Sequence, residues 1–482
     1  MQEPEHPGHA RRHRIAVPTR NDPLLGALTE VAGGPLGRRS APGLVAPGFF
    51  TVERVLVLMT LVSALVAVIF KYHCRKSGWT TPDQYSTVCW SQLPNTFVEA
   101  NLAHAFPFFT PGVTFDQPPL AGMIAGVTAW LTGWAGTGAA RQLAFFDVNA
   151  VLIGIAWLVT VVVTARSARR RPWDAAIVAA SPVLILTAYV SWDFWAAALV
   201  GVGTYLFARR RTWWAGAAIG LAITAAPYAL LVLFVLFLLS IRAGQVMAVL
   251  ETVVTGLVTA CLVVAPVLLV NPAAWGAYVT GFLTRPPSDS SLYGGYNLLA
   301  GRLGFQRLDP VTTNVLELVL VAVVLLGVAF VARAAPRRPR VAQLAFLAVA
   351  GLTVVGKQAA PWQAIWLLPL LALAYPRWRA ALLWQAAVVA HFVALMLFQA
   401  KVLGNLSDQH AIDMPYFVLA AVVDGAATIT LMALVIRGIL DPGQDVVRRL
   451  GVDDPLGGVL EHAPDAVAWR RHAAAPAVGD GG

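Results

Sequence analysis

Residues 71–122 read KYHCRKSGWTTPDQYSTVCWSQLPNTFVEANLAHAFPFFTPGVTFDQPPLAG, a polar and aromatic stretch between two strongly apolar segments. The apolar run before it, Val52 to Phe70, is long enough to cross a bilayer as a helix, which takes about 20 residues. Arginines are frequent before this run, and the cytoplasmic flanks of membrane helices carry an excess of Arg and Lys. The stretch is therefore predicted to be a large, structured extracytoplasmic loop.

The composition is that of an integral membrane protein. Hydrophobic residues make up 58% of the 482-residue chain and charged residues 12%, whereas soluble domains carry about 25% charged residues. The formal net charge of +10 could indicate a nucleic-acid partner. The arginines, however, form short clusters between apolar runs, as at Arg209 to Arg211 and Arg333 to Arg340, which is typical of cytoplasmic loops. The sequence therefore predicts the lipid bilayer, and no nucleic acid, as a partner.

The succession of apolar runs predicts an all-α fold, a polytopic transmembrane helical bundle with about 10–13 membrane segments and structured extracytoplasmic loops. The protein is expected in the plasma membrane with both termini cytoplasmic. Three regions are predicted: a disordered cytoplasmic tail at 1–48, a transmembrane domain at 49–438, and a cytoplasmic C-terminal tail at 439–482. The outer loops of the domain are predicted at 71–118, 271–310 and 401–414.

Two apolar segments are predicted to be irregular. Pro118 to Ala135 is short, and a full crossing there would place the next basic cluster outside, so it is expected to be re-entrant or interfacial. Ala215 to Ser240 has basic residues on both sides and Pro227 in its middle, which favours two half-helices. By contrast, Ala175 to Val190 and Phe194 to Ala208 are predicted to form a helical hairpin.

Two of the three cysteines, Cys74 and Cys89, lie in the first outer loop. In an oxidising compartment they are a natural pair, and closing a loop of this length stabilises the fold by about 3 kcal/mol in the chain-entropy model. The alternative is two unrelated thiols. Cys261 lies in an apolar run and is expected to be a packing residue.

Acidic, basic and aromatic side chains gather in the predicted outer segments. The candidates are Asp83, Glu99, Asp116 and Trp90 in the first loop, Arg285, Asp289 and Tyr293 in the second, Asp193 at the outer turn of a hairpin, and Lys357 and Gln363 at a later outer turn. Such a set is suited to a sugar on a phosphate carrier. A carboxylate can accept the proton of an acceptor hydroxyl, while Arg or Lys stabilises the charge on the departing phosphate.

Each of these residues also has a purely structural interpretation. Trp and Tyr at membrane edges usually form an interfacial belt, and loop carboxylates are usually just solvated. A lysine near a helix end usually extends its ammonium group toward water. Without further information, the sequence predicts a polytopic membrane protein with structured outer loops.

Six motifs follow one another along the chain. They are Cys89-Trp90-Ser91-Gln92, Asp116-Gln117-Pro118-Pro119-Leu120 with Gly122, Ser191-Trp192-Asp193, Arg285 to Tyr293 after Asn271-Pro272, Lys357 through Pro361-Trp362-Gln363 to Pro369, and Asp453 to Gly458. Through these motifs the sequence from about Cys74 to Pro464 resembles the actinobacterial membrane glycosyltransferases of family 87. These belong to the GT-C superfamily of polyprenyl-phosphate-sugar-dependent enzymes.

The resemblance implies transfer of a hexose, such as mannose, from a polyprenyl-phosphate donor to a cell-envelope glycolipid or polysaccharide on the extracytoplasmic face. It implies an acidic residue of the first outer loop as base, with no cofactor and no metal required. Related sequences have an aspartate where this chain has Gln92, and glutamine cannot act as a base. Asp83, Glu99 or Asp116 is then expected to serve instead, and Asp116 is preferred as base or as a group that orients the substrate.

The basic positions of the resemblance are Arg285 and Lys357, which are predicted to bind the donor phosphate. Asp193 is expected either to orient one of them through a salt bridge or to cap the helix that follows it. Asp289, Tyr293, Gln92, Trp90 and Gln363 complete the predicted substrate-binding set.

Two other classes of function are considered. A transporter or flippase for a lipid-linked sugar is favoured by the broken segment around Pro227, although charges in the middle of the apolar runs are few. A non-catalytic envelope-assembly protein is favoured by Gln92.

Overall fold

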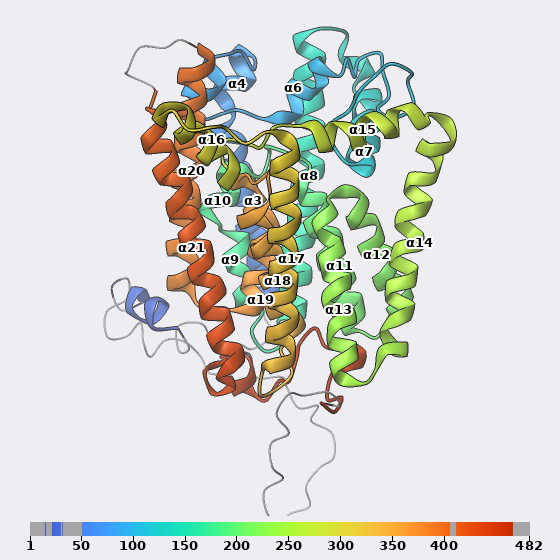
Figure 1. Ribbon diagram of the computed structural model, residues 1–482, viewed down its shortest axis with the longest axis vertical. Helices are drawn as coiled ribbons and strands as arrows, with labels where there is room; N and C mark the ends of the chain where they lie inside the picture. The colour runs from blue at the N-terminus through green and yellow to red at the C-terminus, as the bar shows by residue number, and fades with distance from the viewer. Residues whose placement is uncertain (1–14, 16–21, 30, 32–50, 405–410, 466–482) are drawn as a thin grey trace, which may run out of the picture.

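The computed structural model describes residues 15, 22–29, 31, 51–404 and 411–465. Within these residues the regular secondary structure is entirely helical, which confirms the all-α prediction (Figure 1). Most of the predicted tail at 1–48 lies outside the described residues. In its described part, residues 23–29 are helical, and the Asp22 carboxylate accepts a hydrogen bond of 3.0 Å from the backbone nitrogen of Trp378.

Six helices in the described part of the chain are long and apolar enough to cross a membrane. They are α3 (Val52–Phe70), α8 (Ala139–Ser167), α14 (Val246–Val270), α17 (Pro310–Ala334), α20 (Trp378–Gly404) and α21 (Met414–Leu440). Helices α14, α17 and α21 expose most of their apolar side chains, as expected of surfaces that face lipid. Cys261 of α14 is exposed, so the expectation that it packs inside the bundle is wrong.

Shorter helices complete the bundle. They are α9 (Ala176–Ala179), α10 (Pro182–Thr187), α11 (Asp193–Ala208), α12 (Thr212–Ala225), α13 (Leu230–Ala243), α18 (Val341–Val355) and α19 (Ala364–Ala374). Helix α19 is buried along almost its whole length, and α18 over its first three turns. Other helices surround α18 and α19 (Figure 1), which agrees with their sequences being apolar on all sides.

The proline-broken segment behaves as predicted. Helix α12 ends at Ala225, a 3₁₀ turn covers Pro227–Ala229, and α13 begins at Leu230. Thr212, the first residue of α12, hydrogen-bonds Glu251 near the start of α14, and α14 begins directly after α13. The start of α12 and the end of α13 therefore lie at the same end of the bundle, and the two half-helices form a re-entrant hairpin.

The continuous helix predicted over Ala175 to Val190 is not formed. The segment is divided into a 3₁₀ turn at Pro172–Ala175, α9 and α10. The break falls at Ser181-Pro182, because proline donates no backbone hydrogen bond to the preceding turn. Ser181 caps the new helix by accepting a hydrogen bond of 3.2 Å from the backbone nitrogen of Leu184.

One end of the bundle, here called the loop end, carries the polar segments (Figure 1). It holds α4 (Tyr72–Ser77), α5 (Asp83–Ser86), α6 (Gln92–Glu99), α7 (Pro119–Leu131) with a 3₁₀ turn at Gly133–Ala135, α15 (Pro272–Thr284) and α16 (Leu292–Leu303). Helix α7 has 13 residues, too few for a crossing, in line with the re-entrant or interfacial prediction. Residues 71–118 and 271–310 thus meet at one end, although α5 and α6 are separated from α16 by about two fifths of the chain.

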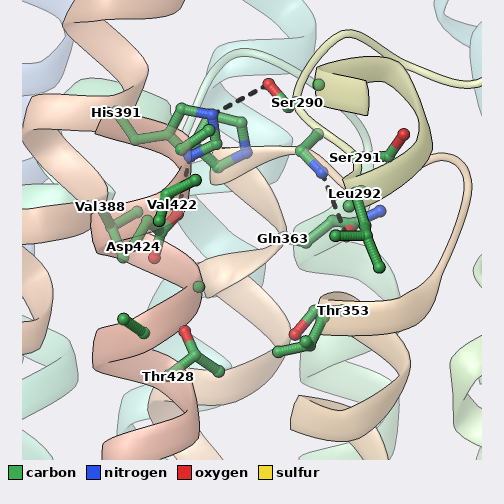
Figure 2. Close-up of a pocket in the computed structure, with 18 of the residues that line it drawn as sticks. Ser290, Ser291, Leu292, Thr353, Gln363, Val388, His391, Val422, Asp424 and Thr428 are labelled. Carbon is green, nitrogen blue, oxygen red and sulfur yellow. Dashed lines mark hydrogen bonds and ion pairs between the residues drawn. The ribbon is translucent and has the colours of Figure 1, made fainter. Parts of the chain in front are cut away.

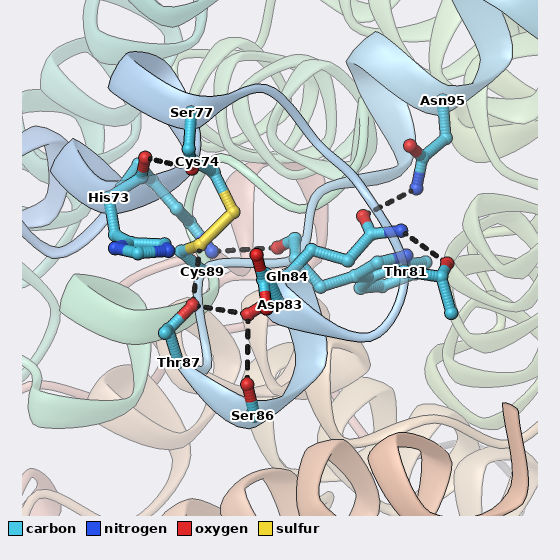
Figure 3. The surroundings of a disulfide bond; sticks show 12 residues. His73, Cys74, Ser77, Thr81, Asp83, Gln84, Ser86, Thr87, Cys89 and Asn95 are labelled. Atoms are coloured by element: carbon cyan, nitrogen blue, oxygen red, sulfur yellow. Dashed lines mark hydrogen bonds between the residues drawn. A yellow bond between two sulfur atoms is a disulfide. The ribbon is translucent and has the colours of Figure 1, made fainter. Parts of the chain in front are cut away.

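The first loop is fixed to the bundle by specific contacts. A disulfide joins Cys74 to Cys89 (Figure 3), and the buried Lys71 Nζ donates to the backbone oxygen of Trp90 at 2.8 Å. Ser91 Oγ donates to the carbonyl of Tyr189 at 2.6 Å. Gly122 is required where α7 passes beneath the loop, because a Cβ there would lie 2.5 Å from the Phe108 ring.

At the opposite end, the C-terminal segment packs closely against the helices. The buried Arg340 side chain binds the Asp445 carboxylate and the carbonyls of Leu373 and Ala374. Asp454 accepts a hydrogen bond of 2.8 Å from the backbone nitrogen of Val341 at the start of α18. Within the region predicted as a polar tail, residues 441–465 are therefore part of the folded domain, while 466–482 lie outside the described residues.

Candidate functional site

A direct ion pair between predicted site residues joins Asp116 to Arg285. Asp116 precedes α7 in the first loop, and Arg285 is the C-cap of α15 in the second. Their side chains form an ion pair of 2.7 Å, with 70% of the Asp116 side chain and 31% of the Arg285 side chain exposed. Two residues 169 positions apart (285 − 116) thus meet in a place that solvent reaches.

Lys357 contacts the segment just before Arg285, but its side chain is enclosed by protein atoms. It follows α18, it is only 1% exposed, and its Nζ donates to the carbonyl of Phe282 at 2.6 Å and to Asn314 Oδ1 at 2.6 Å. The backbone nitrogen of Lys357 donates to Glu317 at 2.8 Å. In this structure the lysine therefore ties the end of α15, which Arg285 follows, to α17.

The turn between α18 and α19 contacts both polar loops, and Ser288 Oγ of the second loop donates to the carbonyl of Ala359 at 2.6 Å. The Trp362 ring packs against that of Trp90 at a centroid distance of 5.3 Å, and Trp90 stacks on Tyr85 at 6.3 Å. Gln363 donates to the carbonyl of Gln358 at 3.0 Å and so stabilises the turn itself. Gln92 begins α6, and its backbone nitrogen donates to the carbonyl of Val190 at 2.9 Å.

Asp193 does not form the salt bridge considered for it in the described residues. Its carboxylate accepts hydrogen bonds from Ser191 Oγ at 2.5 Å and from Trp366 Nε1 at 2.9 Å. The Trp366 ring in turn stacks on Tyr228 at 4.4 Å. Asp193 therefore joins the start of α11 to α19 and to the turn at Pro227, inside the bundle.

The remaining predicted residues are dispersed over the loop end. Asp83 and Glu99 are exposed on α5 and α6. Tyr293 is buried and its hydroxyl donates to the carbonyl of Val355 at 2.8 Å. Asp289 accepts a hydrogen bond of 3.0 Å from Gln399, and burial raises the pKa of its carboxyl.

Beneath this end lies a cavity of about 520 Å³ between α16, α18, α19, α20 and α21 (Figure 2). Most of its lining is apolar, from residues such as Leu292, Val388 and Val422. The Ala359–Gln363 turn forms part of its wall, so the Trp90–Trp362 contact connects the cavity to the first outer loop.

A row of polar side chains enters this cavity from three separate segments. His391 of α20 contacts Asp424 of α21 through Nδ1 at 2.7 Å and Ser290 Oγ through Nε2 at 3.0 Å (Figure 2). These three residues were not predicted from the sequence, whose candidates came from charged and aromatic positions of the outer segments. The sequence did contain a signal for two of them, because His391 and Asp424 each lie within a long apolar run. Ionisable residues inside membrane helices are costly and usually functional.

A comparison with known protein families assigns the chain. The model of glycosyltransferase family 87 matches residues 115–356, about half of the chain, and this region includes Asp116, Asp193 and Arg285. A search of curated proteins gave no match. Together with the helical membrane architecture, the family match shows that this chain belongs to glycosyltransferase family 87 and is a membrane glycosyltransferase.

Proposed function

We propose that the protein transfers a hexose, such as mannose, from a polyprenyl-phosphate donor to a cell-envelope glycolipid or polysaccharide. The reaction takes place at the loop end, which faces the extracytoplasmic side of the plasma membrane, and both termini are cytoplasmic. The family assignment supports glycosyl transfer, and the basic clusters at the end opposite the loops support this orientation.

The observation that carries the proposal is the Asp116–Arg285 ion pair. An arginine side chain can form two parallel hydrogen bonds with a phosphate, so Arg285 suits the phosphate of the donor. The pair is partly exposed, and a phosphate can take the place of the Asp116 carboxylate on the guanidinium group. Asp116 is then released at the site where the sugar is bound, where it orients the substrate or accepts a proton.

The surroundings of the pair suit a lipid-linked substrate. Lys357 adds a second positive charge behind Arg285 and keeps the end of α15 in place. The apolar cavity can take hydrocarbon chains, and the aromatic rings of Trp90 and Trp362 provide flat apolar surfaces against which a sugar can pack. Asp83 and Glu99 are exposed at the same end and contribute negative charge there.

A transporter of lipid-linked sugars is the second candidate, favoured by the re-entrant α12–α13 hairpin and by His391 and Asp424 within long apolar helices. Such a protein would move the labelled lipid across vesicle membranes without transferring its sugar. The two activities are therefore separated by whether label leaves the polyprenyl phosphate.

The proposal is tested with membranes that contain the protein and a radiolabelled polyprenyl-phosphate mannose. The native chain should transfer label to an envelope lipid or glycan. Arg285→Ala should lower kcat/KM by roughly 10²-fold or more, because it removes a charge that stabilises the leaving phosphate. Asp116→Asn keeps the shape of the side chain and should also lower transfer.

Arg75→Ala is the matched control. Arg75 forms an ion pair of 2.7 Å with Asp147, and it also belongs to the loop end. Its loss should leave transfer within about twofold of the native rate, because an exposed ion pair contributes only about 0–1 kcal/mol. Unchanged transfer in both Arg285→Ala and Asp116→Asn would show that the site lies elsewhere.

A further inference from the structure

The Ser290, His391 and Asp424 side chains form a continuous hydrogen-bonded row inside the bundle. His391 lies at the middle of α20 and its side chain is 4% exposed, and that of Asp424 is 15% exposed. Burying ionisable groups within a membrane helix is costly, so such groups are usually retained for binding or proton transfer. The arrangement has no equivalent among the other histidines of the described chain, which form no hydrogen bond through the ring to both a carboxylate and a hydroxyl.

The partners of the ring determine how a neutral imidazole carries its proton. A carboxylate only accepts hydrogen bonds, so Nδ1 bears the hydrogen and donates it to Asp424. The unshared electron pair is then on Nε2, where it accepts from the Ser290 hydroxyl at 3.0 Å. This is the arrangement in which a carboxylate holds a histidine ready to remove a proton from a hydroxyl group.

The imidazole ring of His391 lines a cavity that is large enough for part of a substrate. Both His391 and Asp424 line the apolar cavity of about 520 Å³, with Ser290 at its wall (Figure 2). Among the residues that line it in the described chain, the only other titratable group is Tyr296. No lysine or arginine of this lining competes for Asp424, so the carboxylate is available to His391.

Of the three carboxylates expected to act as base, Asp116 is paired with Arg285, and Asp83 and Glu99 are exposed on α5 and α6 at the loop end. Two carboxylates of the predicted substrate-binding set also have partners: Asp193 accepts from Ser191 and Trp366, and Asp289 accepts from Gln399. Gln92 of the same loop carries an amide, which cannot act as a base. Nε2 of the buried His391 accepts from a hydroxyl at the wall of the cavity. Asp193 also accepts from a hydroxyl, that of Ser191, but it does not line this cavity.

We propose that His391, oriented by Asp424, is the proton acceptor for a hydroxyl group of a lipid-linked acceptor, which enters the cavity and takes the position of the Ser290 hydroxyl. The inference rests on the proposed function. The acceptor oxygen forms a bond to C1 of the sugar, and the bond from C1 to the donor phosphate oxygen breaks. The phosphate keeps the electron pair, and the hydroxyl proton passes to Nε2 of His391.

Kinetics of the same transfer reaction test the proposal. His391→Gln and His391→Ala should lower kcat by roughly 10²–10⁴-fold with little change in KM for the donor, because a general base acts in the chemical step. Imidazole added to His391→Ala should restore part of the transfer. It should not restore transfer by Arg285→Ala, which loses a phosphate-binding group. A purely structural histidine would give no rescue by imidazole.

The positioning role of Asp424 has its own measurement. Asp424→Asn should lower kcat at unchanged KM, and imidazole should not rescue it because the ring of His391 still fills the site. A second measurement uses only the native protein. Diethyl pyrocarbonate, which modifies neutral imidazole, should abolish transfer in step with modification of His391, located by mass spectrometry.

The outcomes separate the two proposals. If the native protein transfers no sugar, the proposed function fails and the inference falls with it. If the native protein transfers sugar and His391 can be replaced or modified without loss, only the inference fails. Labelling of Ser290 by a fluorophosphonate would also overturn it, because Ser290 would then be a nucleophile and not the place of an incoming hydroxyl.

Discussion

Arg340 shows at the scale of one residue how charge is accommodated in this protein. It is 1% exposed, and its side chain donates to both oxygens of Asp445 at 2.8 and 3.1 Å and to two backbone carbonyls at the end of α19. A buried charge is costly unless all of its donors are satisfied. The planar guanidinium group can serve these partners together, whereas a lysine ammonium group cannot.

Replacement of Arg340 by alanine should therefore strongly destabilise the protein. The buried Asp445 would lose its partner, which costs about 3–5 kcal/mol, and the thermal unfolding midpoint in detergent should fall accordingly. Arg337→Ala is the control, because Arg337 binds Asp453 at 2.7 Å with half of its side chain exposed. Its expected cost is at most about 1 kcal/mol. Equal effects of the two replacements would contradict this account.

At the scale of elements, close approach between helices depends on small residues. Helices α12 and α14 pack through Gly220 and Gly256, and a Cβ on Gly220 would lie 2.3 Å from the backbone oxygen of Gly256. Packing between membrane helices is driven largely by such close contacts, since the surrounding lipid is as apolar as the helix surface. These contacts hold the re-entrant α12–α13 hairpin against α14, a helix that is long enough to cross the membrane.

Gly220→Ala should push α14 away from α12 and lower stability by roughly 1–3 kcal/mol. At Gly327 of α17 the position that a Cβ would occupy has no other atom within 4 Å, so Gly327→Ala should be neutral or slightly stabilising. Thermal unfolding of both variants in the same detergent measures the difference. A Gly220→Ala protein as stable as Gly327→Ala would show that the two helices can separate without cost.

The first polar loop, residues 71–118, is a second element whose stability can be tested. Changing Cys74 and Cys89 together to serine should lower the free energy of unfolding by about 3 kcal/mol, because the unfolded loop is no longer constrained. Cys261→Ser is the control, since this thiol is exposed on α14. Reductant should reproduce the effect of the double replacement in the native protein and have no effect on the variant.

For the whole molecule, the central prediction is that the loop end faces the outside of the cell. In a Cys261→Ser background, Thr114→Cys in the first loop should react with a membrane-impermeant maleimide on intact cells. Arg209→Cys, after α11 at the other end, should react only after the membrane is opened. Both positions are exposed in the structure, so access depends on the side of the membrane. Reaction of Arg209→Cys on intact cells would reverse the orientation.

The tertiary structure also decides which of the candidate site residues meet. Asp116 and Arg285 were both identified in the sequence, because loop charges near apolar runs stand out against an apolar background. The role of Lys357 was harder to judge from its position. Only the packed structure encloses its ammonium group among the carbonyl of Phe282 and the side chain of Asn314, from two other segments.

The sequence by itself determined that this is a helical membrane protein with polar loops, a break at Pro227 and a family resemblance, because apolar length, proline and charge act locally along the chain. Only the tertiary structure decided that residues 441–465 pack into the domain and that Ser181-Pro182 divides a helix. It alone brought Ser290, His391 and Asp424 together around one cavity. The physical reason is that these three residues lie on separate segments, and their contacts depend on how the helices pack and not on any local sequence pattern.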